Sequence, residues 1–285
     1  MPVTLLDSAE EFLLQTKDFR ALHPYQLNLI GSVASSIAFN GRTYEKCFWW
    51  VIRDDSQQVV GLAMRTAPHG MVLSPMSRES AIELAESIVV HDDDLPEVAG
   101  PLKELEYFLS AYRTMGSAGS RRTTELAGDE LLYTLGNLTP PHVPGEARVA
   151  NETDFELLND WMASFAEESG ALISDPVAAI RDGIQRGSYY FWIDEGKIVS
   201  LAGHASIVEV LNGSVGRIGP VYTPPAFRGH GYASAVTAVV SQKLLDARAH
   251  VMLFTDATNP TSNGVYKRIG FKLFAGNQRH KFGIV

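Results

Sequence analysis

Cysteine is almost missing from this chain, whose 285 residues include only Cys47. A single thiol excludes an internal disulfide framework and a cysteine-based zinc cluster, and it suits a reducing cytoplasm. Cys47 lies beside Phe48 and Trp49, a setting more typical of a buried structural thiol than of a nucleophile. The eight histidines show no clustering at the spacing of metal ligands, so the sequence predicts no metal site.

Basic charge and long apolar runs are also scarce. The chain has 24 basic and 33 acidic residues, so its formal net charge is −9. This negative charge argues against general binding to nucleic acid or anionic membranes. No apolar run approaches the length of a membrane span, and acidic residues interrupt the N-terminus early. We therefore expect neither a membrane segment nor a secretory leader, and we predict a cytoplasmic monomer or homodimer.

The length of the chain predicts two domains of about 140 residues each. Its 45% hydrophobic and 20% charged residues are ordinary for a globular protein. Glycine and proline gather between residues 136 and 145, where Pro140, Pro141 and Pro144 lie, and this composition indicates a linker. We accordingly predict a first domain over residues 1–139, a linker over 140–146 and a second domain over 147–285.

One stretch of the second half has the pattern of a strand, a glycine-bearing turn and a helix. The apolar run from Ile218 ends at Pro224 and Pro225, which cannot continue a central strand, and helical spacing follows from Val236. Gly229 and Gly231 lie in the turn between them. Glycine lets a ligand approach the backbone, and the unpaired N–H groups at a helix start favour anions. The stretch therefore predicts a cradle for a pyrophosphate.

Two common phosphate loops do not fit this turn. A Walker loop needs a lysine, and none lies between Gly219 and Gln242. A dinucleotide-binding fingerprint would start at Gly229 and Gly231, but its third glycine position holds Ser234. The glycines alone leave an ordinary strand-to-helix turn as an equal alternative.

A second segment supports the ligand-binding interpretation. Asn259 has the position of an N-cap, Pro260 that of the first helical residue, and Gly270 that of a helix stop. Asn259, Ser262 and Tyr266 then fall on one face of the short helix.

Earlier in the same half, Thr153 to Glu156 has the form of a capping box before an amphipathic helix.

Together, the two segments resemble the GNAT N-acetyltransferase superfamily. The segment Arg228-Gly-His-Gly-Tyr-Ala233 is similar to its Arg/Gln-x-x-Gly-x-Gly/Ala signature, and Asn259 to Phe271 is similar to its Asn-x-x-Ser/Ala-x-x-x-Tyr-x-x-x-Gly-Phe segment. The resemblance covers residues 147–285. It implies an α/β fold with a mixed, mostly antiparallel sheet flanked by helices, and it implies acetyl-coenzyme A as the donor.

The resemblance also implies roles for individual residues. A strand ending at Val221, Tyr222 and Thr223 would splay from its neighbour, with a backbone N–H near Val221 as the oxyanion donor. Tyr266 matches the acid that protonates the leaving thiolate, although packing beneath the sheet is the alternative. The general base stays open between Glu209 and His204. The implied cofactor-binding set is Val221, Tyr222, Thr223, Arg228, Gly229, His230, Gly231, Tyr232, Ala233, Asn259, Ser262 and Tyr266. Lys267, Arg268 and Arg279 could meet the nucleotide's phosphates, but solvated surface charges are the default interpretation.

The first half repeats the element order of the second without its motifs. Helices, a hairpin, a strand, a helix, and then a helix and a strand follow one another up to Leu135. The turn after the strand at Met71 contains no glycine between Pro75 and Glu79, and Glu79 would repel phosphate. We predict tandem GNAT-like domains whose first copy is degenerate and lacks the cofactor loop. An unrelated cap domain is the alternative.

These observations predict an acetyl-CoA-dependent N-acetyltransferase that transfers an acetyl group directly to a primary amine of a small molecule or peptide. A non-catalytic acyl-CoA-binding regulatory module is the main alternative, and a nucleotide-binding protein of another fold is a third. The acceptor pocket would depend on the loops around residues 165–190 and on the first domain, so the sequence does not identify the acceptor.

Overall fold

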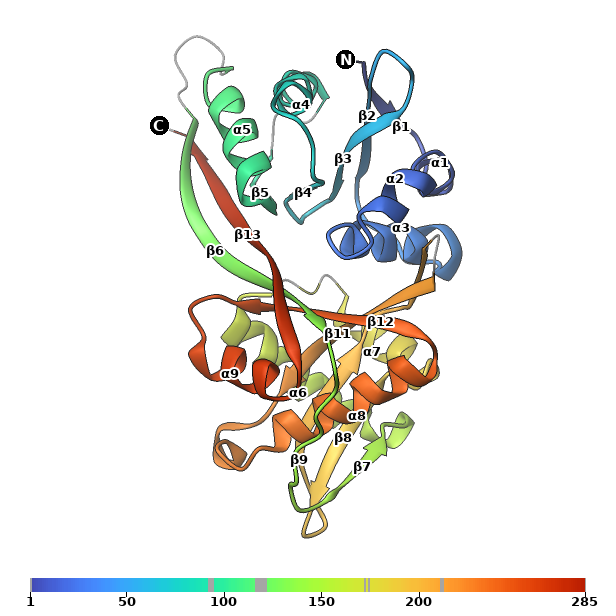
Figure 1. The fold of residues 1–285 in the computed structure, drawn as a ribbon, viewed down its shortest axis with the longest axis vertical. Coiled ribbons are helices and arrows are strands. Elements are labelled where there is room, and N and C mark those ends of the chain that lie inside the picture. Colours follow the sequence, from blue (N-terminus) through green and yellow to red (C-terminus); the bar gives the residue numbers. More distant parts are fainter. Residues whose placement is uncertain are drawn as a thin grey trace. The chain divides into compact units, whose positions relative to one another are not determined.

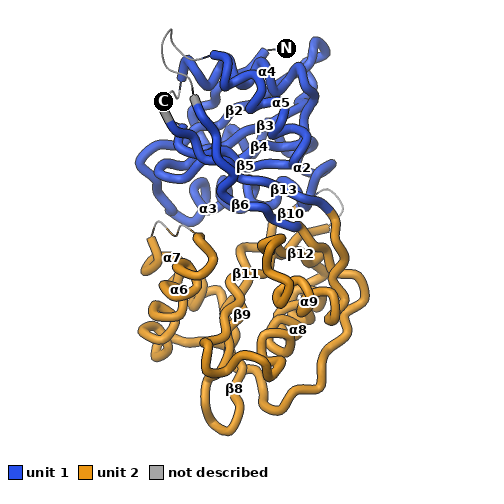
Figure 2. Tube along the Cα trace, turned by 90° about the vertical axis from the view of Figure 1, so that its left-hand side faces the viewer, with its two compact units in different colours: residues 1–131, 210–212, 275–285 blue, residues 132–209, 213–274 orange. Residues whose placement is uncertain are grey.

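Residues 2–91, 95–115, 122–171, 173, 175–210 and 213–284 are described by a computed structural model. The first of its two units comprises residues 1–131, 210–212 and 275–285, and the second comprises residues 132–209 and 213–274 (Figure 2). This division differs from the one expected from the sequence, which put the boundary at 140–146 and the whole C-terminal strand in the second domain. The position of a linker between two ancestral domains stays a prediction.

The first unit is an α/β sheet with helices on both faces (Figure 1). Its strands lie in the order β1-β2-β3-β4-β5-β13-β6. The pair β4–β5 is parallel, and the pairs β1–β2, β2–β3, β3–β4 and β5–β13 are antiparallel. Its elements are β1 (Val3–Leu6), α1 (Ala9–Gln15), α2 (Lys17–Leu22), α3 (Asn28–Asn40), β2 (Cys47–Arg53), β3 (Val59–Thr66), β4 (Met71–Leu73), α4 (Arg78–His91), β5 (Glu97–Pro101), α5 (Leu102–Tyr112) and most of β6 (Arg122–Leu135).

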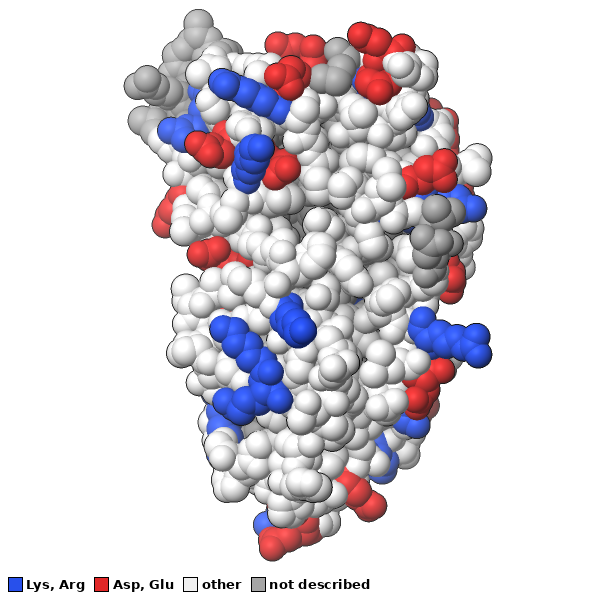
Figure 3. Space-filling model, viewed as in Figure 1, with Lys and Arg blue, Asp and Glu red and all other residues white. Residues whose placement is uncertain are grey.

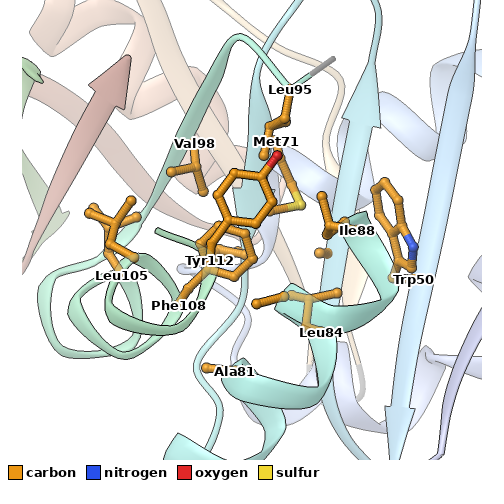
Figure 4. Close-up of a cluster of buried hydrophobic side chains, with 14 of the residues drawn as sticks. Trp50, Met71, Ala81, Leu84, Ile88, Leu95, Val98, Leu105, Phe108 and Tyr112 are labelled. Carbon is orange, nitrogen blue, oxygen red and sulfur yellow. The ribbon is translucent and has the colours of Figure 1, made fainter. Parts of the chain in front are cut away.

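Trp49 and Trp50 are neighbours on β2 and lie on opposite faces of this sheet, because successive strand residues point to opposite sides. Trp49 packs with α1, α2 and α3 residues such as Phe12 and Ile30. Trp50 packs in a second cluster, which holds α4 and α5 residues such as Leu84 and Phe108 (Figure 4). The first unit therefore has a buried core on each side of its sheet.

The second unit follows a similar order, β13-β6-β12-β11-β9-β8-β7, with β10 beside β11. The recorded pairs β7–β8, β8–β9 and β9–β11 are antiparallel, whereas β11 and β12 are parallel. The predicted fold class, a mixed and mostly antiparallel sheet flanked by helices in each half, is confirmed. The elements are β7 (Glu146–Val149), α6 (Phe155–Ser169), α7 (Pro176–Gln185), β8 (Tyr189–Asp194), β9 (Lys197–His204), β10 (Val208–Val210), β11 (Gly213–Tyr222), α8 (Tyr232–Asp246), β12 (Ala249–Asp256), α9 (Pro260–Arg268) and the start of β13 (Phe271–Ile284).

The cap before α6 differs from the one expected. Asn151, not Thr153, opens the capping box: its side chain accepts from the Thr153 N–H at 2.9 Å, and Asp154 accepts from the Asn151 N–H at 2.8 Å. A short 3-10 turn from Glu152 to Asp154 shifts the cap. Asp154 also accepts two hydrogen bonds from Arg148, each of 2.8 Å, and this lowers the pKa of the Asp154 carboxyl.

Two strands of 14 residues, β6 and β13, contribute to both units. In the first unit, the last part of β13 pairs with β5 from Asn277 opposite Pro101 to Lys281 opposite Glu97. In the second unit, the end of β6, from Leu132 to Leu135, belongs to the sheet beside β12. Without β13, strand β5 would present an unpaired edge. The end of the chain thus completes the sheet of the first unit.

A substitution of Phe282 tests how much β13 contributes to the stability of the first unit. Its ring lies 5.0 Å from that of Tyr112 and packs against the α4–α5 cluster. We expect Phe282→Ala to lower the free energy of unfolding by about 2 kcal/mol, because the cluster would lose a partly buried ring. Leu273→Ala, at a position on the same strand that is 59% exposed, should change it by no more than about 0.5 kcal/mol. Urea denaturation measures the free energy of unfolding of both variants. Equal effects of the two substitutions would contradict the contribution of Phe282 to the core of the first unit.

Candidate functional site

The central feature of the second unit is a pair of parallel strands that part. β11 and β12 pair from Ser214 opposite Ala249 to Ile218 opposite Leu253, and the pairing then stops although both strands continue. Gly219 has φ 151, and Pro220 carries no N–H, so the ladder cannot run on through these two residues. The pairing of β11 with β9 shifts register here and resumes at Val221 and Tyr222. Strand β11 thus stays joined to β9 while it leaves β12.

A loop at the end of this strand presents unpaired backbone donors. We call residues 228–233 the cradle loop. Gly229 and Gly231 have φ values of 86 and 84, which side chains rarely allow. Gly231 is the N-cap of α8 and brings no side chain to cap it. The N–H groups from Gly229 to Ala233 make no hydrogen bond with the described residues, so they point the positive end of the α8 dipole at any bound anion.

Side chains from distant segments surround the cradle loop. Arg228 donates from Nε to the Thr223 carbonyl at 2.9 Å, and its terminal nitrogen donates to both carboxylate oxygens of Glu168, at 2.8 and 2.7 Å. Tyr232 donates its hydroxyl hydrogen to Asp194 at 2.5 Å. A Cβ on Gly231 would lie 3.0 Å from a methyl carbon of Val143, within the expected linker.

Sequence reasoning did not include three of these neighbours, Glu168, Asp194 and Val143. No local pattern marks them, because each meets the loop through a contact between segments far apart in the chain. His230, which the sequence analysis did include, stacks on Tyr232 with ring centroids 5.4 Å apart. The loop is therefore shaped by residues that no motif contains.

Helix α9 carries the second predicted segment. Asn259 caps it by accepting from the Ser262 N–H at 3.0 Å, and Pro260 is its first residue. Asn263 donates to the carbonyls of Asp256 and Asn259, at 3.0 and 2.9 Å, and so ties the helix to the end of β12. Tyr266 therefore projects from a helix that is fixed to one of the two parting strands.

Tyr266 is buried, with 8% of its surface exposed, and its ring lies 6.0 Å from that of Phe271. Burial raises the pKa of Tyr266 to about 12, because a phenolate would lose its hydration. Its hydroxyl has no hydrogen-bond partner among the described residues, and it is not one of the fully enclosed polar atoms. It is thus a protonated donor, free to bind a ligand atom.

His204 lies on β9 directly opposite Ile218, the last paired residue before β11 leaves β12. Its Nδ1 is 2.9 Å from the Ala205 carbonyl; a hydrogen on Nδ1 satisfies that contact and leaves Nε2 as the basic nitrogen. Burial lowers the pKa of His204. The hydrogen bond to the Ala205 carbonyl raises this pKa, and the nearby Arg186 charge lowers it, so that the net shift is downward. The imidazole is therefore neutral near pH 7 and able to accept a proton.

The remaining candidates occupy different surroundings. Glu209 is exposed on β10, and its side chain makes no hydrogen bond or ion pair with the described residues. Lys267 and Arg268 are exposed on α9, where the face drawn in Figure 3 carries blue basic side chains and no red ones. Arg279 belongs to the first unit, where its Nη1 lies 3.6 Å from Glu97, and its expected contact with a phosphate stays a prediction.

The corresponding turn of the first unit, between β4 and α4, is filled by its own side chains. Ser74 accepts from the Leu62 N–H at 2.7 Å and donates to the Pro75 carbonyl at 2.8 Å. Ser77 accepts from the Ser80 N–H at 3.1 Å at the start of α4. Helices α4 and α5 also share one buried cluster (Figure 4). The absence of a cofactor loop from this turn stays a prediction.

The described part of the chain lacks two features, a metal-binding cluster and a membrane-spanning helix. It holds no group of three or more His, Cys, Asp or Glu side chains arranged to bind a metal ion. It also holds no helix with the length and apolar character needed to cross a membrane.

Comparisons with known proteins give a consistent family. Residues 198–280 match the family model described as FR47-like protein. A mycothiol acetyltransferase of Pseudarthrobacter chlorophenolicus is 31% identical over 137 residues, which cover 46% of this chain and 41% of that protein. The chain thus matches less than half the length of this curated relative.

Solved structures resemble the chain over nearly its whole length. A GCN5-related N-acetyltransferase from Sphaerobacter thermophilus has a TM-score of 0.65 at 11% identity, over 99% of this chain and 95% of that one. A tandem GNAT protein from the clavulanic acid biosynthesis pathway has a TM-score of 0.55 at 11% identity, over 99% and 98%. At these identities, the likeness establishes the fold alone.

The burial of neutral His204 predicts a pH dependence of stability. Its folded-state pKa is lowered, so the unfolded chain takes up a proton first as the pH falls through about 6.5, and the free energy of unfolding decreases. We expect His204→Gln to reduce that decrease relative to the parent, whereas His23, His69 and His280, whose pKa values burial also lowers, contribute equally to both proteins. Urea unfolding between about pH 5 and 8 measures the effect. An equally steep loss in both proteins would contradict the burial of a neutral imidazole.

Proposed function

We propose that the protein is an acetyl-coenzyme A-dependent N-acetyltransferase, because its second half matches the FR47-like family model and a mycothiol acetyltransferase. It transfers an acetyl group directly to a primary amine of a small molecule or peptide. The observation that carries the proposal is the row of unpaired N–H groups from Gly229 to Ala233, at the end of the strand that leaves its neighbour.

The cradle loop fits the pyrophosphate of coenzyme A. Its N–H groups supply donors, the α8 dipole favours negative charge, and a Cβ at Gly229 would meet nothing within 4 Å, so its surroundings are open. Past Pro220, the backbone of Val221 to Thr223 no longer pairs with β12, and these groups would hold the pantetheine arm. An N–H near Val221 would stabilise the oxyanion. Bound acetyl-coenzyme A supplies an activated thioester.

His204 is the better supported general base. Its position opposite Ile218 places it where β11 and β12 part, and the Ala205 carbonyl fixes Nδ1 so that Nε2 is free to accept the proton of the amine. Its lowered pKa keeps it unprotonated. Glu209 has no contact with the described residues that would orient it, and it would act through water.

Tyr266 would act on the leaving thiolate by donating a hydrogen bond from its hydroxyl. With a pKa of about 12 for the tyrosine and about 8.5 for a thiol, complete proton transfer would be unfavourable by roughly 5 kcal/mol. Tyr266 therefore stabilises the developing charge on the thiolate by a hydrogen bond and keeps its proton. Its free hydroxyl and the free nitrogen of His204 favour an enzyme over a non-catalytic acyl-CoA-binding module, which would need the cradle alone.

We also propose that the first half is a degenerate copy of the second. Both units have the same strand arrangement, but the turn at Ser74 to Ser80 is closed by hydrogen bonds from its own side chains. The likeness to a tandem GNAT protein over 99% of the chain supports the same interpretation. One chain should then bind one molecule of coenzyme A. The third alternative, a nucleotide-binding protein of another fold, does not agree with this architecture.

Ligand-induced stabilisation tests the donor. Acetyl-coenzyme A at about one hundred times its dissociation constant should stabilise the protein by roughly 2.7 kcal/mol, whereas ATP and NAD at the same concentration should have less effect. Thermal unfolding measures the shift. Gly231→Ala should diminish it, because a Cβ is strained at φ 84 and would press on Val143. Equal stabilisation by NAD and acetyl-coenzyme A would contradict the proposed donor.

Turnover of a tyrosine variant tests the proposed chemistry. Tyr266→Phe should leave the affinity for coenzyme A nearly unchanged and lower kcat by about a hundredfold, because a positioned proton donor is lost. The ratio to the parent should stay constant between about pH 7 and 10, since the Tyr266 pKa of about 12 lies above that range. Tyr133→Phe is the matched control, because it removes a buried hydroxyl that has no partner. Equal turnover of Tyr266→Phe and the parent, in a screen of amine acceptors, would remove the assigned role.

A further inference from the structure

The cradle loop has few backbone hydrogen bonds of its own: the Arg228 N–H donates to the Pro225 carbonyl at 3.3 Å, and the Gly231 carbonyl accepts from the Ala235 N–H at 3.1 Å. A loop that offers its N–H groups to a ligand has none left to bond to itself, and those from Gly229 to Ala233 are unpaired. Its two glycines with positive φ are also the least restricted of residues. Between these two backbone bonds, side-chain contacts are needed to fix the loop against the rest of the unit.

Arg228 provides the main attachment at the start of the loop. Its bond from Nε to the Thr223 carbonyl is local, since both residues belong to the connection between β11 and α8. The bonds to Glu168 reach a different element, the 15-residue helix α6. That helix is anchored in the core by Leu158 and Met162.

The same helix supports the strand end that leads into the loop. The ring of Trp161 on α6 lies 5.8 Å from that of Tyr222, edge to face. Trp161 and Glu168 thus hold the two ends of one connection, the last residue of β11 and the first residue of the cradle loop. Through these contacts α6 sets the position of the loop.

We propose that Glu168 is a positioning residue, which orients the cradle loop for a diphosphate by holding Arg228. This inference rests on the proposed function of the loop. Glu168 does not touch the ligand, and its carboxylate charge is neutralised by the guanidinium 2.7 Å away. Removing the carboxylate therefore releases Arg228 and the loop, and this effect exceeds the small relief of repulsion at an exposed, solvent-screened position.

The test compares two acetyl donors, acetyl-coenzyme A and S-acetyl-pantetheine, of which only the first carries a diphosphate. Glu168→Gln should raise the dissociation constant for coenzyme A and the KM for acetyl-coenzyme A about fivefold and leave kcat within about twofold. The kcat/KM for S-acetyl-pantetheine should not change. Glu167→Gln is the matched control, because Glu167 is an exposed neighbour on α6 without an ion pair to the described residues. It should behave as the parent does.

A double-mutant cycle shows whether Glu168 acts through Arg228. Arg228→Gln should weaken coenzyme A binding at least as much as Glu168→Gln, and the double variant should bind no more weakly than Arg228→Gln. Additive losses, equal losses with both donors, or unchanged or tighter binding by Glu168→Gln would each overturn the positioning role while leaving the proposed function in place. Failure of the parent protein to bind coenzyme A would overturn both.

Discussion

The proposed site depends on a single residue that cannot donate a backbone hydrogen bond. Pro220 interrupts β11 in mid-strand, so pairing with β12 ends at Ile218 while pairing with β9 resumes at Val221. The main-chain groups that β12 would otherwise satisfy become available to a ligand. The cradle loop lies at the end of this same strand, His204 lies opposite the last pair, and Tyr266 lies on the helix fixed to the other strand. The proposed acid, the proposed base and the proposed anion site thus all lie around the point where β11 leaves β12.

Sequence patterns were sufficient where the determining contacts are local. The Asn259 cap, the proline at the first position of α9 and the glycine turn before α8 all depend on neighbours within a few residues, and the structure has each of them. The cap before α6 was placed two residues late, because a 3-10 turn there follows the same capping chemistry as a helix. Element order likewise predicted the architecture of both halves.

Local sequence patterns could not predict contacts between segments that are far apart in the chain. Nothing near Glu168 indicates that it meets Arg228, and Arg279 was associated with the second domain because it follows Tyr266 in the sequence. The structure places Arg279 against Glu97, since β13 crosses from the sheet of one unit to that of the other. Chain order alone cannot show such a crossing, because the periodicity of a strand is the same whichever partner it takes.

The crossing of β13 also constrains how the protein is made. During synthesis, the residues of β1 to β5 leave the ribosome well before residues 275–285, which pair with β5. The first unit therefore cannot close its sheet until residues 275–285 have been made, and an exposed strand edge persists until then. Such distant pairing slows folding and favours association with other chains. A chain that stopped before residues 277–281 were made would leave that edge of β5 unpaired.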